Sequence, residues 1–457
     1  MSRTKNRQPE NKMGVMPINK LLLSMAVPMM ISMLVQALYN VVDSIFVSQL
    51  NENALTAVSL AFPVQNIMIA VCTGTGVGIN AFVSKALGSR DQEKANRTAN
   101  NGLLLAFFTS AAFAVLIGSL GRLFFSIQTD DTQIADYGTS YIRIVGIISF
   151  GMVFQITLER LLQSTGKTIY SMITQTAGAV INIILDPIMI FGLLGFPRME
   201  VAGAAMATVI GQVCASALAL YFNLRHNPEL TINLKKYRLC GKTIAEIYSV
   251  GLPSILMASI GSVMNFFMNR ILISFTSTAV AVFGVYFKLQ SFVFMPVFGL
   301  NGGIVPIIAY NYGARRPDRI MKTAALGLAY AAGIMAAGTI IFLTIPRPLL
   351  MLFNASEAML EIGIPALRII SLCFIFAAAG ITMSSVFQAM GKGTLSLIMS
   401  VFRQLVVLLP AAYLLSKISL SAIWWAFFIA EVCCFGLGVY FFLRLYNEKI
   451  KPLGEGE

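Results

Sequence analysis

The segment LQSTGK at 162–167 returns as FQAMGK at 387–392, and this recurrence decides the fold of the chain. The two segments lie 225 residues apart, and the same offset holds without a gap from Pro28 to Ser171. Other matched pairs are Asn40 and Asn265, Gln65 and Gln290, Gly74 and Gly299, Gly78 and Gly303, Gly88 and Gly313, Arg90 and Arg315, Gly102 and Gly327, and Arg143 and Arg368. One constant offset over this length indicates a duplication, so we expect two structurally equivalent halves.

The composition is that of a membrane protein. Hydrophobic residues make up 57% of the 457 residues and charged residues 12%, with a mean hydropathy of +0.77. A soluble domain carries roughly 25% charged residues, so this chain lacks the charge to cover a water-facing surface. Several uncharged stretches exceed the ~20 apolar residues that span a bilayer as a helix. They are residues 54–84, 98–121, 201–224, 289–314 and 323–346.

We therefore predict an all-α membrane protein with twelve transmembrane helices in two pseudo-symmetric six-helix bundles. The predicted spans are 21–50, 54–84, 98–121, 134–164, 170–194, 200–224, 245–275, 279–312, 323–345, 359–390, 394–416 and 420–446. Six spans in the first half give both halves the same orientation in the membrane. The predicted parts are a cytoplasmic tail 1–20, an N-lobe 21–224, a linker 225–244, a C-lobe 245–446 and a cytoplasmic tail 447–457.

The formal charge of +13 is explained by topology rather than by nucleic-acid binding. In the twelve-span arrangement, basic residues gather on one side, at 3–20, 85–97, 225–242, 315–322 and 444–451. The other side carries only Arg122, Arg198, Arg347 and Lys417. This asymmetry predicts a multi-pass protein of the plasma (inner) membrane with both termini in the cytoplasm. Its N-terminus has neither the short apolar core nor the cleavage site of a signal peptide.

Carboxylates deep inside the predicted spans are rare, and such residues usually face a bundle interior or a water-filled cavity. The first span has a polar stripe, spaced i, i+3, i+4 and i+7, formed by Gln36, Tyr39, Asn40 and Asp43. In the fifth span Asn182 and Asp186 lie four residues apart, on one face. The sixth span adds the hydroxyl of Thr208 among small residues suited to close helix contact.

Where these three helices converge, Asp43, Asn182, Asp186 and Thr208 supply hard oxygen ligands. Two close carboxylates do not both stay ionised without a cation, so the set suits Na⁺ or a shared proton. The alternative is a static role, in which the two acids only bind neighbouring helices. The second half has apolar residues at the aligned positions, Met268, Val407 and Ala411, which favours a function carried by one lobe.

Other polar residues inside spans are weaker candidates. Glu159 lies near the cytoplasmic end of its span and either pairs locally with Arg160 or lines a cavity. Lys288 lines a cavity or extends its charge to the membrane surface. Pro28 and Pro187 share spans with the two acids and are hinge candidates, because a proline removes one helical hydrogen bond.

Enzymatic and nucleotide-driven functions are disfavoured by what the sequence contains. TGTGVG at 73–78 lies inside a membrane span with no strand before it, so it does not match a dinucleotide loop. GKT at 166–168 has Leu161 where a phosphate loop needs glycine. The six cysteines form no CxxC motif and His226 has no partner ligands. We expect no cofactor and no catalysis, with energy taken from an ion gradient.

From about residue 20 to residue 446 the sequence resembles the multidrug and toxic compound extrusion (MATE) transporters. The motifs that carry the resemblance are AVPMMISMLVQALYNVVDSIFVSQL at 26–50, VGINAFVSKALGSRD at 77–91, NIILDPIMIFG at 182–192, VAGAAMATVIGQ at 201–212 and VPIIAYNYGARR at 305–316. The likeness is to the bacterial branch with its key acid in the first helix. The branch with acids on the seventh and tenth helices is disfavoured, since spans 245–275 and 359–390 have no deep carboxylate.

The resemblance implies a V of two six-helix bundles whose central cavity opens to either side alternately. It implies that Asp43, Asn182, Asp186 and Thr208 form a cation-coupling site, where Na⁺ or H⁺ enters in exchange for organic cations or lipophilic drugs. We expect a monomer in contact with membrane lipids. One alternative is a flippase for lipid-linked oligosaccharides or peptidoglycan precursors, which would need a strongly cationic cavity. Another is an integral membrane enzyme, which would need catalytic groups at a membrane surface.

Overall fold

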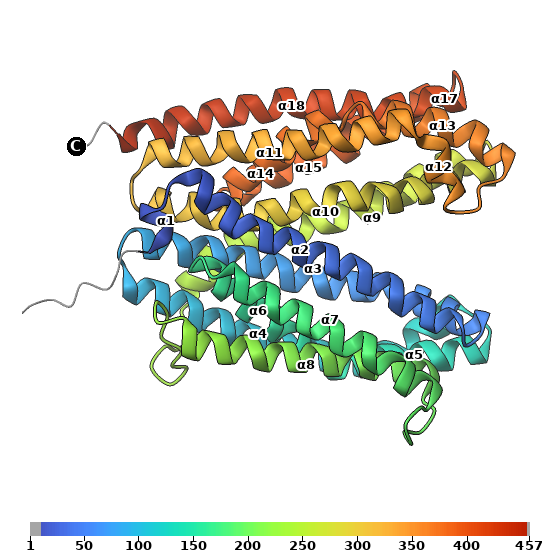
Figure 1. The fold of residues 1–457 in the computed structure, drawn as a ribbon, viewed down its shortest axis with the longest axis horizontal. Helices are drawn as coiled ribbons and strands as arrows, with labels where there is room; N and C mark the ends of the chain where they lie inside the picture. Colours follow the sequence, from blue (N-terminus) through green and yellow to red (C-terminus); the bar gives the residue numbers. More distant parts are fainter. Residues whose placement is uncertain (1–10, 455–457) are drawn as a thin grey trace, which may run out of the picture.

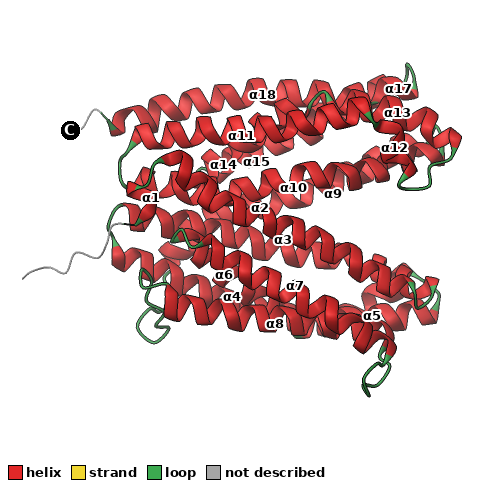
Figure 2. Ribbon diagram, in the orientation of Figure 1, coloured by secondary structure: helices red, strands yellow, loops and turns green. Residues whose placement is uncertain are grey.

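The computed structural model describes residues 11–454, which fold into helices joined by short loops, with no strand in that part of the chain (Figures 1 and 2). The helices of the first half are α1 (Lys12–Val15), α2 (Ile18–Ser48), α3 (Glu52–Gly88), α4 (Gln92–Gln128), α5 (Thr132–Ile147), α6 (Phe150–Ser164), α7 (Thr168–Phe191) and α8 (Glu200–His226). Most are far longer than the helices of soluble domains, as expected of spans that cross a bilayer.

The second half repeats this order after a connection at 227–240. Its helices are α9 (Gly241–Ile273), α10 (Ser277–Gly313), α11 (Pro317–Thr344), α12 (Pro346–Met351), α13 (Glu357–Ser371), α14 (Phe374–Ala389), α15 (Gly393–Val401), η1 (Phe402–Leu408, a π-helix), α16 (Leu409–Leu415), α17 (Leu420–Ile423), α18 (Trp425–Leu445), η2 (Tyr446–Ile450, a π-helix) and η3 (Lys451–Leu453, a 3₁₀-helix). The segment α15–η1–α16 is one continuous span with a π-helical middle.

The structure confirms the predicted fold class. Ten helical segments of the described chain are long and apolar enough to cross a membrane. Two further spans are bent pairs, α5 with α6 at 45° and α13 with α14 at 49°. They occupy the predicted spans 134–164 and 359–390, at nearly equivalent points of the repeat. With each bent pair as one span, the chain has twelve spans, six in each lobe.

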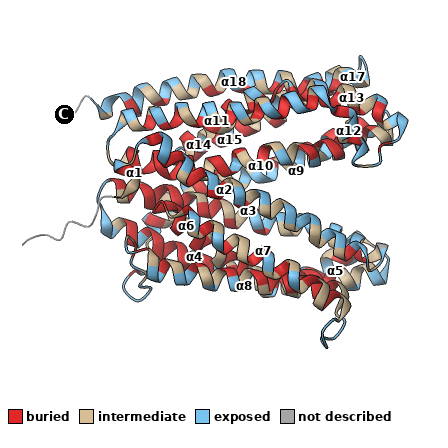
Figure 3. Ribbon diagram, in the orientation of Figure 1, coloured by how far each residue is buried: buried red, intermediate tan, exposed pale blue. Residues whose placement is uncertain are grey.

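The two lobes, α2–α8 and α9–α18, meet at one end of the molecule and diverge at the other (Figure 1). We call the closed end, where α1 lies, the α1 end. α2 runs between the lobes and packs on both α7 and α10, while α3 packs on both α9 and α10. The N-terminal half of α2 is largely buried and its C-terminal half is largely half-buried or exposed (Figure 3). The lobes therefore form the expected V.

Duplicated glycines make the contact between the lobes at the α1 end. A Cβ atom on Gly88 of α3 would lie 1.9 Å from the carbonyl oxygen of Tyr310 in α10. One on Gly313, the repeat partner of Gly88, would lie 2.0 Å from the carbonyl oxygen of Lys85. One on Gly78 would lie 2.1 Å from a carbonyl oxygen of α9. No side chain fits at these positions, so the backbones of the two lobes touch.

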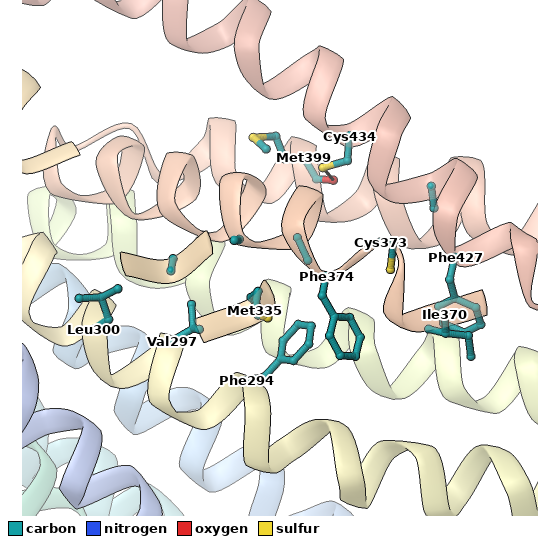
Figure 4. Close-up of a cluster of buried hydrophobic side chains, with 14 of the residues drawn as sticks. Phe294, Val297, Leu300, Met335, Ile370, Cys373, Phe374, Met399, Phe427 and Cys434 are labelled. Atoms are coloured by element: carbon teal, nitrogen blue, oxygen red, sulfur yellow. Dashed lines mark hydrogen bonds between the residues drawn. The ribbon is translucent and has the colours of Figure 1, made fainter. Parts of the chain in front are cut away.

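The C-lobe core is apolar and aromatic (Figure 4). Phe374 packs edge-on against Phe294 and Phe342, with ring centroids 5.2 and 5.4 Å apart. Many large apolar side chains on the outside of the bundles are exposed, such as Val115, Leu116 and Ile340. In a membrane these side chains contact lipid tails, so their exposure carries no penalty.

The helix ends refine the predicted division of the chain. α2 begins at Ile18 rather than at residue 21, and the predicted tail 1–20 contains α1. Residues 1–10 and 455–457, with the tail predictions that fall on them, lie outside the described residues. The division into two tails, a linker and two lobes at the stated boundaries stays a prediction.

Candidate functional site

Asp43 and Asp186 meet inside the N-lobe. Their carboxyl groups, from α2 and α7, are within hydrogen-bonding reach of one another. Asp186 is fully buried, and Oδ1 of Asp43 is a buried atom with no other hydrogen-bond partner among the described residues. Two ionised carboxylates at this separation would repel strongly in a low dielectric. The arrangement therefore needs a proton or a cation between the two groups.

Asn182 and Thr208 extend this pair toward α8. With the Asn182 amide oxygen facing Thr208, it accepts hydrogen bonds from the Thr208 hydroxyl at 3.2 Å and from its backbone N–H at 3.0 Å. The amide NH₂ then donates to Oδ2 of Asp186 at 3.3 Å. Asn182 is one α-helical turn before Asp186, so both side chains lie on one face of α7. All four residues predicted for the cation site thus lie together.

The orientation of the Asn182 amide matters for the chemistry of the site. Rotating the amide by half a turn would bring its oxygen to 3.3 Å from Oδ2 of Asp186. Two acceptors at that distance are stable only when a cation lies between them or when Oδ2 of Asp186 carries a proton that it donates to the amide oxygen. The satisfied orientation suits a site with a shared proton, and the rotated one offers an extra oxygen ligand for Na⁺.

A cavity of about 130 Å³ adjoins the acid pair within the N-lobe. Asn182 and Thr208 line one part of it, and Glu159, Arg160 and Gln163 line another. The other lining residues are Met29, Met33, Gln36, Tyr39, Ile69, Thr73, Met152, Gln155, Ile156, Gln175, Gly178, Ala179 and Gln212. One water needs about 10–15 Å³ of such space, so the cavity has room for several waters. The lining is polar enough to bind them.

The polar stripe of the first span only partly faces this cavity. Gln36 and Tyr39 line it, and the Gln36 side chain accepts a hydrogen bond from Gln175 of α7 at 2.9 Å. Tyr39 also interacts electrostatically with Asp43 and Asp186. Asn40, predicted on the same face, is exposed and is not a lining residue. The supporting face is therefore narrower than the sequence spacing indicates.

Glu159 is buried and belongs to the cavity wall. Its Oε1 accepts hydrogen bonds from Gln155 at 3.1 Å and from Thr174 at 3.0 Å. Arg160, the predicted local partner, instead donates to the side chain of Gln163 at 2.8 Å. The cavity alternative for Glu159 thus fits the geometry, and the local ion pair does not.

Lys288 and the two hinge prolines lie elsewhere. The Lys288 side chain is exposed, with its ammonium 5.8 Å from the centroid of the Phe353 ring, and it does not line the N-lobe cavity. Pro28 lies in the buried half of α2. Pro187 follows Asp186 directly in α7 and has no N–H to donate to the carbonyl of Ile183. Their hinge role stays a prediction.

Sequence reasoning missed several polar residues around the acid pair and the cavity. Gln65 donates a hydrogen bond to the hydroxyl of Tyr141 at 3.0 Å, and Tyr141 interacts electrostatically with Asp43. Thr174 and Gln175 also contribute, as described above. One signal was available for α7, because Thr174, Gly178, Asn182 and Asp186 follow one another at intervals of four. Nothing local points to Gln65 or Tyr141.

The C-lobe has a fixed ion pair in the corresponding region. Nη1 of Arg403 lies 2.8 Å from Oε1 of Glu431, joining η1 to α18. By the repeat offset Arg403 corresponds to Gly178, which lines the N-lobe cavity. The C-lobe thus fills this position with a permanent internal cation, whereas the N-lobe leaves space beside two unpaired acids.

Twelve membrane-spanning helices in two lobes, with an acid pair beside a polar cavity in one of them, define an integral membrane transporter. The chain belongs to the MatE family, whose model matches residues 28–188 and again 253–414. The two matched ranges begin 225 residues apart, at the offset of the repeat. The resemblance to MATE transporters is thereby confirmed.

Several known proteins are similar over nearly the whole chain. One is the multidrug export protein MepA of Staphylococcus haemolyticus, 27% identical over 432 residues that cover 94% of each chain. MepA of Staphylococcus aureus (strain MRSA252) is 25% identical, with 92% of each chain covered. Among solved structures, a multidrug resistance MATE family transporter of the MOP superfamily in an outward-facing conformation aligns with a TM-score of 0.90. It is 26% identical and covers 98% of this chain and 99% of that one.

Proposed function

We propose that this protein is a secondary active multidrug efflux transporter, which exports cationic or lipophilic compounds by antiport with Na⁺ or H⁺ through alternating access. The observation that carries the proposal is the contact between Asp43 and Asp186, beside a polar cavity and without a fixed cation. The similar proteins named as multidrug exporters supply the class of substrate.

The acid pair provides the step that consumes the ion gradient. A proton or Na⁺ entering between the two carboxyls removes their mutual repulsion and stabilises the contact between α2 and α7. When the ion leaves, the repulsion returns and the contact between α2 and α7 weakens. Asn182 and Thr208 complete the oxygen set for the ion. Energy from the gradient is thus converted into a change in how α2 packs.

α2 is suited to pass this change to the other lobe. Its C-terminal half carries Asp43 against the N-lobe, while its N-terminal half packs in the C-lobe core through Leu21, Leu22 and Met25. Pro28 lies about 22 Å from Asp43 along the helix, at 1.5 Å per residue. A bend at Pro28 would let the C-terminal half of α2 move when the ion binds or leaves, while its N-terminal half stays packed in the C-lobe.

The charge distribution sets the proposed orientation. The basic clusters 85–97, 225–242 and 315–322 lie at the α1 end, so this end faces the cytoplasm by the positive-inside rule. Both termini are then cytoplasmic, and the divergent end of the V opens outward. We propose a plasma-membrane location, a monomer, and lipid around the exposed apolar faces.

The flippase alternative is less consistent with the charges of the C-lobe. The sequence offers Lys288, Arg270 and Arg403 as the bases of a cationic central cavity. Arg403 is paired with Glu431, and Lys288 lies against the ring of Phe353. The pairing with Glu431 neutralises one of the three charges that such a cavity would use to bind a pyrophosphate-linked lipid.

The proposal is tested by gradient-driven transport in proteoliposomes. Ethidium or norfloxacin efflux is measured with Na⁺ and pH gradients imposed separately, for the wild type and for Asp43→Asn and Asp186→Asn. We expect both variants to lose gradient-driven efflux, because the one carboxylate left has no second acid with which to share a proton or a Na⁺ ion. The matched control is Asp130→Asn, an exposed aspartate far from the pair. Undiminished efflux in both site variants would overturn the proposal.

A further inference from the structure

The segment Asn11–Pro17, which we call the strap, joins both lobes at the α1 end. On the N-lobe side the Asn11 amide donates to the carbonyl oxygen of Thr165 at 3.0 Å and to the carboxylate of Glu229. Thr165 ends α6, and Glu229 lies in the connection that follows α8. On this side Asn11 supplies the printed hydrogen bonds, and the ammonium group of Lys12 adds an electrostatic attraction to Glu229.

On the C-lobe side the strap is held by several side chains. Arg319 of α11 donates to the carbonyl oxygens of Met13 at 2.9 Å and Met16 at 2.8 Å. Arg316 donates to the carbonyl oxygen of Gly14 at 2.7 Å, and Asn311 donates to that of Met13 at 3.1 Å. Four hydrogen bonds hold the strap on this side, three of them from arginines, against the two that Asn11 makes to the N-lobe. Because bonds from a charged donor or to a charged acceptor are the strong ones, the larger number of them makes the C-lobe attachment the firmer one.

The burial of the strap also indicates that it packs with the C-lobe. Met13 is fully buried, and it belongs to the C-lobe core together with Ile18, Leu21 and Leu22. The strap and the first turns of α2 thus pack as part of the C-lobe, although α2 is the first helix of the N-lobe.

The repeat contains the mirror arrangement. The connection before α9 is bound to the N-lobe helix α4, where Asn100 bonds the backbone of Thr231 and Asn101 bonds the backbone of Arg238 and Cys240. Each lobe therefore holds the segment that precedes the first helix of the other lobe. In the described part of the chain, the strap has in addition the Asn11 side chain, which bonds the N-lobe while the strap is held by the C-lobe.

We propose that the hydrogen bonds from Asn11 to Thr165 and Glu229, which we call the clasp, hold the cytoplasmic end closed. When the lobes separate at that end, the strap stays with the C-lobe and these bonds break. This inference rests on the proposed alternating access. Asn11 and Met13 are two residues apart, so extended chain between them covers at most ~7 Å. The strap is too short to keep both attachments across an opened gap, and the weaker attachment breaks.

The test separates the clasp from the cap that Asn11 also provides. Its side-chain oxygen accepts a hydrogen bond from the backbone N–H of Met13 at 2.8 Å and caps α1. Asn11→Asp keeps this acceptor but has no donor for Thr165 or Glu229. Glu229→Ala removes one acceptor of Asn11 and the charge that attracts Lys12, and it leaves the sequence of the strap unchanged. Asn233→Asp, the same chemical change at an exposed linker position, is the matched control.

Spin labels are attached at Lys235→Cys and Lys392→Cys, both exposed at the α1 end, in a background without other cysteines. Double electron–electron resonance between the two labels measures the separation of the lobes. We expect Asn11→Asp and Glu229→Ala to raise the ratio of open to closed cytoplasmic ends by about tenfold. We expect Asn233→Asp to match the wild type.

Distance distributions of Asn11→Asp and Glu229→Ala that coincide with the wild type overturn the clasp. Should Asn11→Asp fail to fold, Glu229→Ala alone decides, since it leaves α1 and its cap intact. Drug export by the unlabelled wild type is measured in the same vesicles. If the wild type exports drug but the variants show no change in label distances, only the clasp is contradicted. If the label distances change but the wild type does not export drug, only the proposed function is contradicted.

Discussion

The carboxyl groups of Asp43 and Asp186 lie within hydrogen-bonding reach of each other, although they stand on the first and fifth spans of the N-lobe. The repeat-equivalent positions in the C-lobe, Met268 and Ala411, carry no charge. A fixed arginine in the C-lobe and an exchangeable ion in the N-lobe are two ways to satisfy acids inside a membrane. Only the exchangeable one can couple transport to a gradient.

Na⁺ should stabilise the wild-type protein against heat. At alkaline pH the acid pair is free to bind Na⁺, and a ligand that binds only the folded state at 100 times its Kd adds about 2.7 kcal/mol. The unfolding temperature in detergent should therefore rise with Na⁺ for the wild type and stay constant for Asp186→Asn. Choline chloride controls for ionic strength. A wild-type unfolding temperature that Na⁺ leaves unchanged would assign coupling to protons alone.

Gly88→Ala should open the contact between the lobes at the α1 end. The added Cβ would lie 1.9 Å from the carbonyl oxygen of Tyr310, so the helices must separate. We expect drug efflux in vesicles to fall at least about tenfold, because the cytoplasmic end no longer closes. Gly333→Ala is the control, since its Cβ would meet no atom within 4 Å and alanine favours a helix by ~1 kcal/mol. Equal efflux by the two variants would contradict this role for Gly88.

Breaking the Arg403–Glu431 pair should destabilise the C-lobe without altering ion coupling. Removing either partner leaves a largely buried charge unpaired, at a cost of up to about 3 kcal/mol, the lower end of the range for fully buried pairs. Arg403→Met and Glu431→Leu should each lower the unfolding temperature, and the double variant should recover most of the loss. Efflux per folded molecule should keep its Na⁺ or pH dependence in the double variant. Single variants as stable as the wild type would rule out this structural role.

Cys240 should be the most reactive of the six cysteines, all of which are free. Hydrogen bonds from the backbone and hydroxyl of Thr243 lower the pKa of the Cys240 thiol, with a smaller contribution from Arg97. A lowered pKa leaves more thiolate at a given pH, so labelling should persist to lower pH than for a free thiol. Cys240→Ser is the control that identifies the labelled site.

The same reaction reports topology. A membrane-impermeant maleimide should label Cys240 in inverted vesicles and not in intact cells, because the connection 227–240 lies at the end proposed to face the cytoplasm. Labelling in intact cells would reverse the orientation proposed from the basic clusters.

The number and order of the spans were predictable because they depend on local composition. An apolar run long enough to cross a bilayer forms a helix whatever its neighbours, since lipid offers the backbone no other hydrogen-bond partner. The constant offset between LQSTGK and FQAMGK then required two similar lobes. The site acids were also visible, because a carboxylate such as Asp186 inside an apolar run has few structural explanations.

Contacts between distant helices were not predictable in the same way. Gln65 and Tyr141 meet near the acid pair, and Glu431 finds Arg403, through packing that no local pattern encodes. Asn40 belongs to the same polar stripe as Tyr39 but is exposed. Helical spacing indicates which residues share a face, but it does not indicate how much of that face neighbouring helices cover.

The sequence by itself determined the membrane class, the duplicated twelve-span plan and the rare carboxylates proposed to bind an ion, since these depend on composition and spacing along one helix. The tertiary structure alone decided that Asp43 meets Asp186, that Gly88 and Gly313 bring two backbones into contact, and that Asn11 links a strap held by the C-lobe to the N-lobe. These contacts depend on how helices far apart in the chain pack together, and packing is a property of the whole fold.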